Sequence, residues 1–389
     1  MRLDGNRQGT LIGHLDGSLA FRSFRPRPLE DVCGTLSLDA NQQLSVSTCA
    51  NKLGELKGVA RGIPDVQMYL AMYVRKEALL SAQIEGTQCT LDDVLDPDNQ
   101  DAVHQDVSEV ISYIRALDFA VDRMGDFPLC TRLLRETHAV LLENTRGEEK
   151  TPGEIRVSQN WIGPAGCTLN EAFYVPPSVS DMQQALGSLD SFINAEVSID
   201  PIVKTALVHY QFETIHPFLD GNGRLGRLLI TLMLIHEGVF TSPVLYPSYE
   251  LKMRRDEYYE RLTAVRKRGE YEEWIAFFCD CLASSARDAV RSMDALAKIH
   301  HEAETRIRGR LGRNLTNGLR LLEFIEAHPI MDIPFAVQQL GISRTTLASL
   351  VKEFCDLDIL RLREAARQRY RTYLYERYLE VLRFGADPL

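Results

Sequence analysis

Two apolar helical segments that flank one glycine-rich run constrain the fold more than any other feature of the sequence. Val203, Leu207 and Tyr210 share one helical face before the run. The segment after it has a wider stripe, formed by Leu225, Leu228, Leu229, Leu232 and Ile235. Because an apolar stripe has to be buried against neighbouring elements, this pattern predicts a bundle of helices as the core, with residues 216–227 between two of them.

The same spacing predicts helices along most of the chain. They are expected over residues 65–85, 101–124, 130–143, 179–195, 201–213, 224–236, 254–268 and 270–300. Residues 151–177 are punctuated by proline and glycine, which predicts a hairpin or an extended loop. Residues 1–60 have weak periodicity and predict an irregular arm with short helices. The predicted fold class is mainly α, with a short β-hairpin.

Composition limits the class of protein. The chain has 389 residues, of which 45% are hydrophobic and 25% charged, so it is long enough for two or three domains with ample core. Its net charge of −10 argues against a surface that coats nucleic acid and leaves room only for a local basic patch. The eight cysteines include no Cys-x-x-Cys pair, and no stretch nears the roughly 18 apolar residues of a membrane span. We therefore expect a cytoplasmic protein with reduced thiols and no membrane contact.

A step in charge suggests where the domains divide. Residues 314–389 contain as many basic as acidic side chains, so residues 1–313 carry the whole net charge. We expect an N-terminal arm over 1–60, a main helical domain over 61–300, a basic connector over 301–313 and a separate domain over 314–389. The connector is marked by Arg306, Arg308, Arg310 and Arg313.

The glycine-rich run reads HPFLDGNGRLGR over residues 216–227. Gly221, Gly223 and Gly226 fit the spacing G-x-G-x-x-G of dinucleotide-binding folds. That interpretation needs a buried strand before the glycines, and here the preceding segment is helical. The run also lacks the Gly-Lys-Ser/Thr ending of a P-loop. We therefore reject both interpretations.

The residues of this run instead indicate an anion site beside a base. Glycines around Asn222 let successive backbone N–H groups point into one concavity at the start of a helix. Arg224 and Arg227 are three positions apart on that helix and can clamp further phosphate oxygens. Asp220 offers one carboxylate, which suits Mg²⁺ when nucleotide phosphates complete its coordination. His216 has a side chain suited to accept a proton at neutral pH. Together they predict phosphoryl or nucleotidyl transfer.

The run also resembles the signature of the Fic family, H-x-F-x-[DE]-G-N-G-R-x-x-R, at every position, and Phe212, Glu213, Thr214 and Ile215 before it are common in such proteins. The resemblance implies transfer of AMP from ATP to a hydroxyl group of a protein. It implies that His216 deprotonates a Ser, Thr or Tyr, and that Asp220 holds Mg²⁺. It further implies an anion hole and a clamp on the outer phosphates, formed by Gly221, Asn222 and Gly223 and by Arg224 and Arg227.

A second resemblance lies in the helix predicted over 65–86. Ser81 to Gly86 matches the inhibitory motif of such proteins, [ST]-x-x-x-E-[GN], with Ser81 and Glu85 on one helical face. The resemblance implies that Glu85 pairs with Arg227 and prevents productive seating of the γ-phosphate. A carboxylate at the C-terminal end of a helix is unfavourably placed against the helix dipole, which is a further hint that Glu85 has a partner.

The resemblance extends over residues 50–300 in weaker form. Residues 152–156, 161–163 and 173–177 look like the flap hairpin beside which a target segment adds as a strand. A further set of residues is similar to the part of the fold that lines the adenine pocket in such proteins: Tyr258, Tyr259, Arg266 and Trp274.

Residues 314–389 look like a winged helix-turn-helix. Helices are expected over 317–327 and 332–341, and Ser343 can cap a third that runs to about Phe354. Residues 359–375 would form the wing, with arginines that could follow phosphates: Arg361, Arg363, Arg367, Arg369 and Arg371. The neutral charge of the segment equally fits a module for dimerisation or domain packing.

Several alternatives stay open at this point. The preferred hypothesis is a Mg²⁺-dependent protein adenylyltransferase that uses ATP, is restrained by Glu85 and modifies a target protein or itself. The same site could remove AMP from a modified protein, with Glu85 orienting water, or transfer a phosphate or phosphocholine. The chain could also be a DNA-binding regulator that senses nucleotides. Homodimer formation and DNA binding by the C-terminal domain stay undecided.

Overall fold

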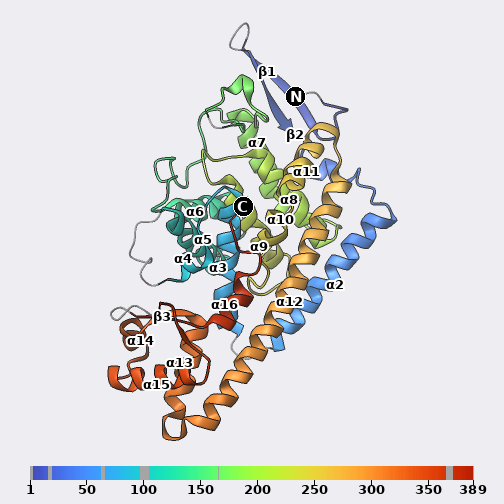
Figure 1. Cartoon of the computed structure of the whole chain (residues 1–389). Helices are drawn as coiled ribbons and strands as arrows, with labels where there is room; N and C mark the ends of the chain where they lie inside the picture. Colours follow the sequence, from blue (N-terminus) through green and yellow to red (C-terminus); the bar gives the residue numbers. More distant parts are fainter. Residues whose placement is uncertain are drawn as a thin grey trace. The chain divides into compact units, whose positions relative to one another are not determined.

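The computed structural model describes residues 3–15, 20–62, 66–96, 105–164, 166–364 and 371–388 (Figure 1). They form two compact units. The first unit comprises residues up to Gly54 together with Ser112–Ala286, and the second comprises Glu55–Ile111 together with Arg287–Leu389. Three helices contain residues of both units, namely α2 (Ala40–Gly62), α5 (Gln105–Arg123) and α12 (Tyr271–Arg310). The chain is mainly helical, as predicted.

The first unit is built on two central helices, α8 (Pro201–Ile215) and α9 (Asn222–His236). Every residue of α8 from Ile202 to Ile215 is buried. The two helices approach closely at Gly226, where a Cβ atom would overlap the Glu213 side chain. Around them lie the remaining helices of the unit, which are α1 (Leu29–Cys33), α6 (Thr131–Leu142), α7 (Val179–Asn194), α10 (Ser248–Met253) and α11 (Arg255–Arg268).

Buried polar side chains tie this core together. The main-chain oxygen of Gly226 can only accept a hydrogen bond, so His209 donates to it from Nδ1 over 2.8 Å. His209 Nε2 then accepts from the Tyr258 hydroxyl at 2.9 Å. Burial lowers the pKa of His209 to about 3, so the ring is neutral in the folded protein. The pair fixes α9 and α11 against α8.

The N-terminal residues differ from the predicted irregular arm. β1 (Gly9–His14) and β2 (Phe21–Pro26) form an antiparallel hairpin in which Gly9 lies opposite Pro26. The short helix α1 and then the 23-residue helix α2 follow it. Its buried stripe is a single residue wide, formed by Cys49, Leu53, Leu56 and Ala60. So narrow a stripe hardly stands out from the polar residues around it, which is why the sequence pattern gave only weak periodicity.

The segment 151–177 is the extended loop that was expected as the alternative to a hairpin. Among its described residues, one antiparallel bridge, Ile162 to Tyr174, joins the two arms, beside a short 3-10 turn at Leu169–Glu171. Residues 155–157 form no strand, because the main-chain N–H of Arg156 donates to the carbonyl of Pro217 instead of to a partner strand. The flap is therefore bonded to the glycine-rich run itself.

The second unit contains α3 (Val66–Ile84), α4 (Leu91–Leu95) and a C-terminal module that follows α12. The module consists of α13 (Leu315–Ala327), β3 (Ile330–Asp332), α14 (Ile333–Leu340), α15 (Arg344–Asp356), β4 (Arg361–Leu362), β5 (Thr372–Leu374) and α16 (Glu376–Arg383), after a 3-10 turn at Gly312–Asn314. Its three strands form an antiparallel sheet of order β3-β5-β4. Ser343 caps α15 as expected, by accepting from the N–H of Thr346 at 3.3 Å.

The helix predicted over 270–300 is longer than expected, because α12 continues through most of the predicted basic connector, to Arg310. Ala303 and Ile307 are buried and extend the apolar stripe of the helix by another turn. Arg308 forms an ion pair with Glu304, four residues earlier, which supports the helix at its exposed face. In the described part of the chain, no helix is long and apolar enough to cross a membrane.

Candidate functional site

The glycine-rich run forms the loop between α8 and α9, in the first unit. Asn222, the first residue of α9, closes this loop with its side chain. Its Oδ1 accepts from the N–H of Phe218 and its Nδ2 donates to the carbonyl of Phe218, both over 2.9 Å. Asn222 is buried and clamps the loop. Its part in the anion hole stays a prediction. The clamp sets the shape of residues 218–222.

His216 ends α8 in an unusual backbone conformation. Its φ of 51° and ψ of 61° lie in the left-handed region, which disfavours a residue with a Cβ atom. The following residue is Pro217, and a residue before proline normally prefers an extended conformation. Backbone strain of this kind persists only where surrounding contacts enforce it, and it gathers at functional sites.

Two side chains of the flap provide those contacts. The carbonyl of His216 accepts hydrogen bonds from Arg156 Nε at 3.0 Å and from Asn160 Nδ2 at 3.1 Å. Arg156 is buried, and its other nitrogens donate to the carbonyls of Ser158 and Pro177. Burial lowers the pKa of Arg156 to about 10. Arg156 and Asn160 were not predicted to act on the site, and here they hold the backbone of His216.

His138 of α6 holds the other end of the loop. Its Nδ1 accepts from the N–H of Gly153 at 2.9 Å, so the neutral ring carries its proton on Nε2. That nitrogen donates to the carbonyl of Asp220 at 3.0 Å. The ring also stacks on Phe218, with centroids 3.8 Å apart. Sequence reasoning missed His138, although a histidine between Leu134 and Leu141 on a buried stripe is a detectable signal.

Asp220 points a half-exposed carboxylate toward the start of α9. Its Oδ1 accepts from the N–H of Gly221 at 2.6 Å and lies 4.0 Å from Arg224 Nη2. Its Oδ2 lies so close to Gly147 that a Cβ atom there would be 2.9 Å away. Glycine at position 147 thus leaves room around the carboxylate oxygen.

These surroundings fit a magnesium ion that arrives with a nucleotide. No group of three or more His, Cys, Asp or Glu side chains that could enclose a metal occurs in the portion of the chain that the structure describes. Mg²⁺ is commonly held by one or two carboxylates while phosphates and water complete its shell. Asp220 offers such a single carboxylate.

The start of α9 gathers the positively charged elements of the site. Gly221 precedes the helix with a φ of 72° and brings no side chain that could cap its first N–H groups. Gly223 follows in the first turn. Arg224 is 5% exposed and Arg227 fully buried. Two guanidinium groups of such low exposure beside a helix N-terminus make this end of α9 favourable for an anion.

The residues predicted for the adenine pocket are placed differently from one another. Tyr258 is buried and bonded to His209, in a cluster of rings with Trp274. Arg266 is buried against the end of α8, where it donates to the carbonyl of Glu213 at 3.1 Å and lies over the Tyr174 ring. Tyr259 is 39% exposed. A role beside adenine stays a prediction for all three.

The predicted inhibitory motif belongs to the second unit, whereas residues 216–227 belong to the first. Ser81 lies in the last turn of α3 and is buried. Glu85 directly follows α3 and is exposed. The chain turns at Gly86, whose φ of 99° ends the helix. The pairing of Glu85 with Arg227 stays a prediction.

Comparison with known proteins supports the sequence signature. Residues 44–122 match the model for the Fic/DOC family N-terminal region, and residues 128–234 match the model for the Fic/DOC family. Two similar proteins are both named protein adenylyltransferase Fic. The one from Drosophila yakuba is 29% identical over 184 residues, which cover 45% of this chain and 34% of that protein. The one from Drosophila willistoni is 33% identical over 131 residues, which cover 33% and 23%.

A solved structure supports the fold. A Fic family protein from Desulfovibrio desulfuricans superposes with a TM-score of 0.54 and 19% sequence identity, over 87% of this chain and 97% of that chain. At this identity the likeness concerns the fold alone. The chain spans about a third of the length of the Drosophila yakuba relative. Both Fic/DOC family models thus match this chain, and the signature of the family is complete in residues 216–227.

Proposed function

We propose that the protein transfers AMP from ATP to a hydroxyl group of a protein. The observation that carries this proposal is the loop of residues 216–222, in which a strained histidine, a half-exposed carboxylate and an open helix N-terminus lie within seven residues. The names of the Drosophila relatives support the same reaction.

The reaction assigns a task to each part of the loop. A Ser, Thr or Tyr hydroxyl oxygen attacks the α-phosphorus, the bond to the bridging oxygen of the β-phosphate breaks, and pyrophosphate leaves. His216 accepts the proton of the attacking hydroxyl. General-base help of this kind contributes about 10²–10⁴-fold. Arg156 and Asn160 hold the main chain of His216, from which the imidazole extends.

The phosphates belong at the start of α9. Gly221 and Gly223 allow an oxygen close access to the helix N–H groups, and Arg224 and Arg227 add fixed positive charge. Asp220 would hold Mg²⁺, which supplies charge neutralisation on the phosphates when it is bound. Most of the rate enhancement would come from positioning and charge stabilisation, as in other phosphoryl transfers.

We further propose that Glu85 restrains this activity. Three preparations test the proposal: wild type, Glu85→Gly and Glu85→Gly/His216→Ala, each incubated with Mg²⁺, α-labelled ATP and cell lysate. We expect strong labelling of protein bands only with Glu85→Gly. Equal labelling of wild type and Glu85→Gly would show that Glu85 does not restrain transfer. Labelling that survives His216→Ala would show that His216 is not the base.

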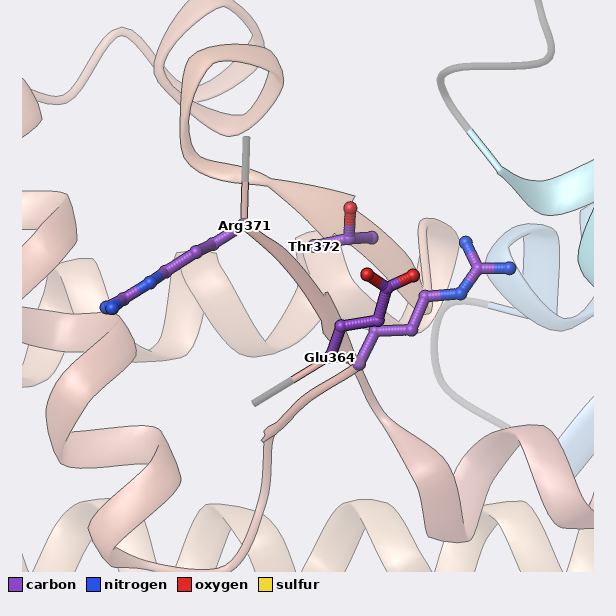
Figure 2. Close-up of a pocket in the computed structure, with 4 residues that line it drawn as sticks. Glu364, Arg371 and Thr372 are labelled. Atoms are coloured by element: carbon purple, nitrogen blue, oxygen red, sulfur yellow. The ribbon is translucent and has the colours of Figure 1, made fainter. Parts of the chain in front are cut away.

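For the C-terminal module, the described contacts favour packing over a phosphate-tracking wing. Arg361 pairs with Glu376 at 2.8 Å, and Arg363 pairs with Asp96. Arg367 and Arg369 lie outside the described residues. Figure 2 shows Arg371 extending away from Glu364 and Thr372, and the hollow between these residues and Arg363 is too small for a ligand. We therefore assign this winged-helix-like module an intramolecular role.

A further inference from the structure

The C-terminal end of the described chain binds the segment that carries the predicted inhibitory motif, within the second unit. Gln83 is completely buried in the last turn of α3, and its Nε2 donates to the carbonyl of Ala386 at 2.9 Å and to that of Cys89 at 2.8 Å. Ala386 is itself buried. A residue between Ser81 and Glu85 is thus hydrogen-bonded to a residue about 300 positions later.

An ion pair reinforces this attachment. Arg383, the last residue of α16, donates from Nε and Nη2 to the two carboxylate oxygens of Asp92, each over 2.7 Å. Its Nη1 donates to Glu376 at 2.8 Å. Hydrogen bonds to these carboxylates raise the pKa of Arg383. Both groups of the Asp92 pair are about 30% exposed, and the two-point geometry makes this contact stronger than an ordinary surface pair.

The position of Asp92 connects this pair to the motif. Asp92 lies in the first turn of α4, which begins six residues after Glu85. Thr90 caps α4 through its side chain, so the start of α4 is fixed at this residue. Arg363 binds Asp96 at the other end of α4. The C-terminal module therefore holds both ends of α4 and, through Gln83, the end of α3.

We propose that Arg383 is a positioning residue for the inhibitory motif: with Ala386 it fixes residues 81–90, and so keeps Glu85 where it restrains AMP transfer. The inference rests on the proposed function, in which Glu85 is the restraint. It predicts that whatever loosens the C-terminal module from α4 activates the enzyme. Because the folded module is attached to this segment, a movement of the module changes the position of residues 81–90.

The variants Arg383→Gln and Asp92→Asn remove the ion pair from either side. The matched control is Arg377→Gln, which removes another ion pair of α16, the one to Glu302 at 2.8 Å, and leaves α4 untouched. Two readouts are needed. The first is hydrogen exchange of the amides of Glu85, Gly86 and Thr87, which donate to the carbonyls of Ala82 and Gln83. The second is labelling by α-labelled ATP.

We expect amide exchange and labelling each to rise about fivefold or more in Arg383→Gln and Asp92→Asn, and neither to rise in Arg377→Gln. The double variant Arg383→Gln/Asp92→Asn should label no faster than either single variant. In a Glu85→Gly background, Arg383→Gln should add nothing. Either variant of the pair is sufficient for the test if the other does not fold.

The outcomes separate the two proposals. If Glu85→Gly labels protein and Arg383→Gln behaves as wild type, the positioning role is wrong and the proposed function stands. Faster labelling with Arg377→Gln as well would indicate general loosening of the module and would overturn the specific role of Arg383. If Glu85→Gly itself transfers no AMP, the proposed function falls and this inference falls with it.

Discussion

His138 Nε2 donates a hydrogen bond to the main-chain oxygen of Asp220 over 3.0 Å, while the other nitrogen of the same ring accepts from Gly153 in the flap. One imidazole thus joins the flap to the loop that carries the carboxylate. The pKa of His138 is lowered to about 4 by burial, so the ring keeps the neutral form that both bonds require.

Substitution of His138 should therefore weaken transfer through Asp220 and the flap. His138→Phe keeps the stack on Phe218 and loses both hydrogen bonds, whereas His138→Gln retains a donor and an acceptor. In the Glu85→Gly background we expect about a 10- to 100-fold loss of labelling rate for His138→Phe and a smaller loss for His138→Gln. Equal rates for the two variants would show that the hydrogen bonds have no role in positioning.

The strained backbone of His216 predicts that two inactive variants of this residue differ in stability. Glycine relieves left-handed strain and alanine does not, although both remove the imidazole. His216→Gly should exceed His216→Ala in free energy of unfolding by roughly 1–2 kcal/mol, as measured by urea denaturation. Neither variant should transfer AMP. If His216→Ala were as stable as His216→Gly, the strain would not be real.

The loop clamp of Asn222 predicts that a single atom exchange is harmful. Asn222→Asp replaces the donor to Phe218 by an acceptor that faces a carbonyl oxygen. We therefore expect the free energy of unfolding to fall by about 1–3 kcal/mol and the labelling rate to fall more than tenfold. Asn194→Asp is a control, because Asn194 Nδ2 likewise donates to main-chain carbonyls, those of Leu129 and Asp190, far from this loop in sequence. It should lower stability and leave the labelling rate of the folded protein unchanged.

The close approach of α8 and α9 depends on Gly226. Gly226→Ala would drive a methyl group into the buried Glu213 side chain, so we expect about 1–3 kcal/mol of destabilisation and a lower transfer rate. Gly187→Ala, in α7, meets open space and should leave stability unchanged or raise it by up to about 1 kcal/mol. Thermal unfolding of Gly226→Ala and Gly187→Ala separates the cost of the steric overlap at Gly226 from the gain in helix propensity that both substitutions share.

His328 predicts a pH dependence of stability in the second unit. Burial, and to a smaller extent the charge of Arg75, lower its pKa from 6.5 to about 4. The unfolded chain therefore takes up this proton first, and stability falls as the pH drops from about 6.5 to 4. His328→Phe preserves ring packing against Phe324 and Phe335 and removes the proton.

Between pH 7 and pH 5 the variant should lose about 1 kcal/mol less unfolding free energy than wild type, after allowance for the partial exposure of the ring. Urea denaturation at the two pH values measures this difference. Parallel losses in both proteins would mean that His328 is already protonated in the folded state, or that it is not enclosed.

The elements that the sequence predicted share a strong local signal. The helices over 201–213 and 224–236 were expected from wide apolar stripes, and α8 and α9 confirm them within a few residues. The hairpin of β1 and β2 was missed because its pairing is decided by contacts between strands and not by local pattern. The helix over 101–124 is confirmed from Gln105 onward, and its first four residues lie outside the described chain.

The residues of the site also fall into those that a local pattern predicted and those that it missed. His216, Asp220 and the arginines of α9 were readable because they lie in one ordered run. Arg156, Asn160 and His138 act through main-chain carbonyls and amides, and a carbonyl acceptor leaves no mark on the sequence of the loop that provides it. Their roles depend on how α6 and the flap fold onto residues 216–222, which local spacing does not specify.

The measurement that tests the central claim most directly compares ATP labelled at the α-phosphate with ATP labelled at the γ-phosphate, using Glu85→Gly protein, Mg²⁺ and cell lysate. We predict that protein bands take up label from α-labelled ATP only, and that His216→Ala in the same background abolishes it. Uptake from γ-labelled ATP would mean phosphate transfer. Absence of label from both, with ATP binding demonstrated separately, would contradict AMP transfer to protein.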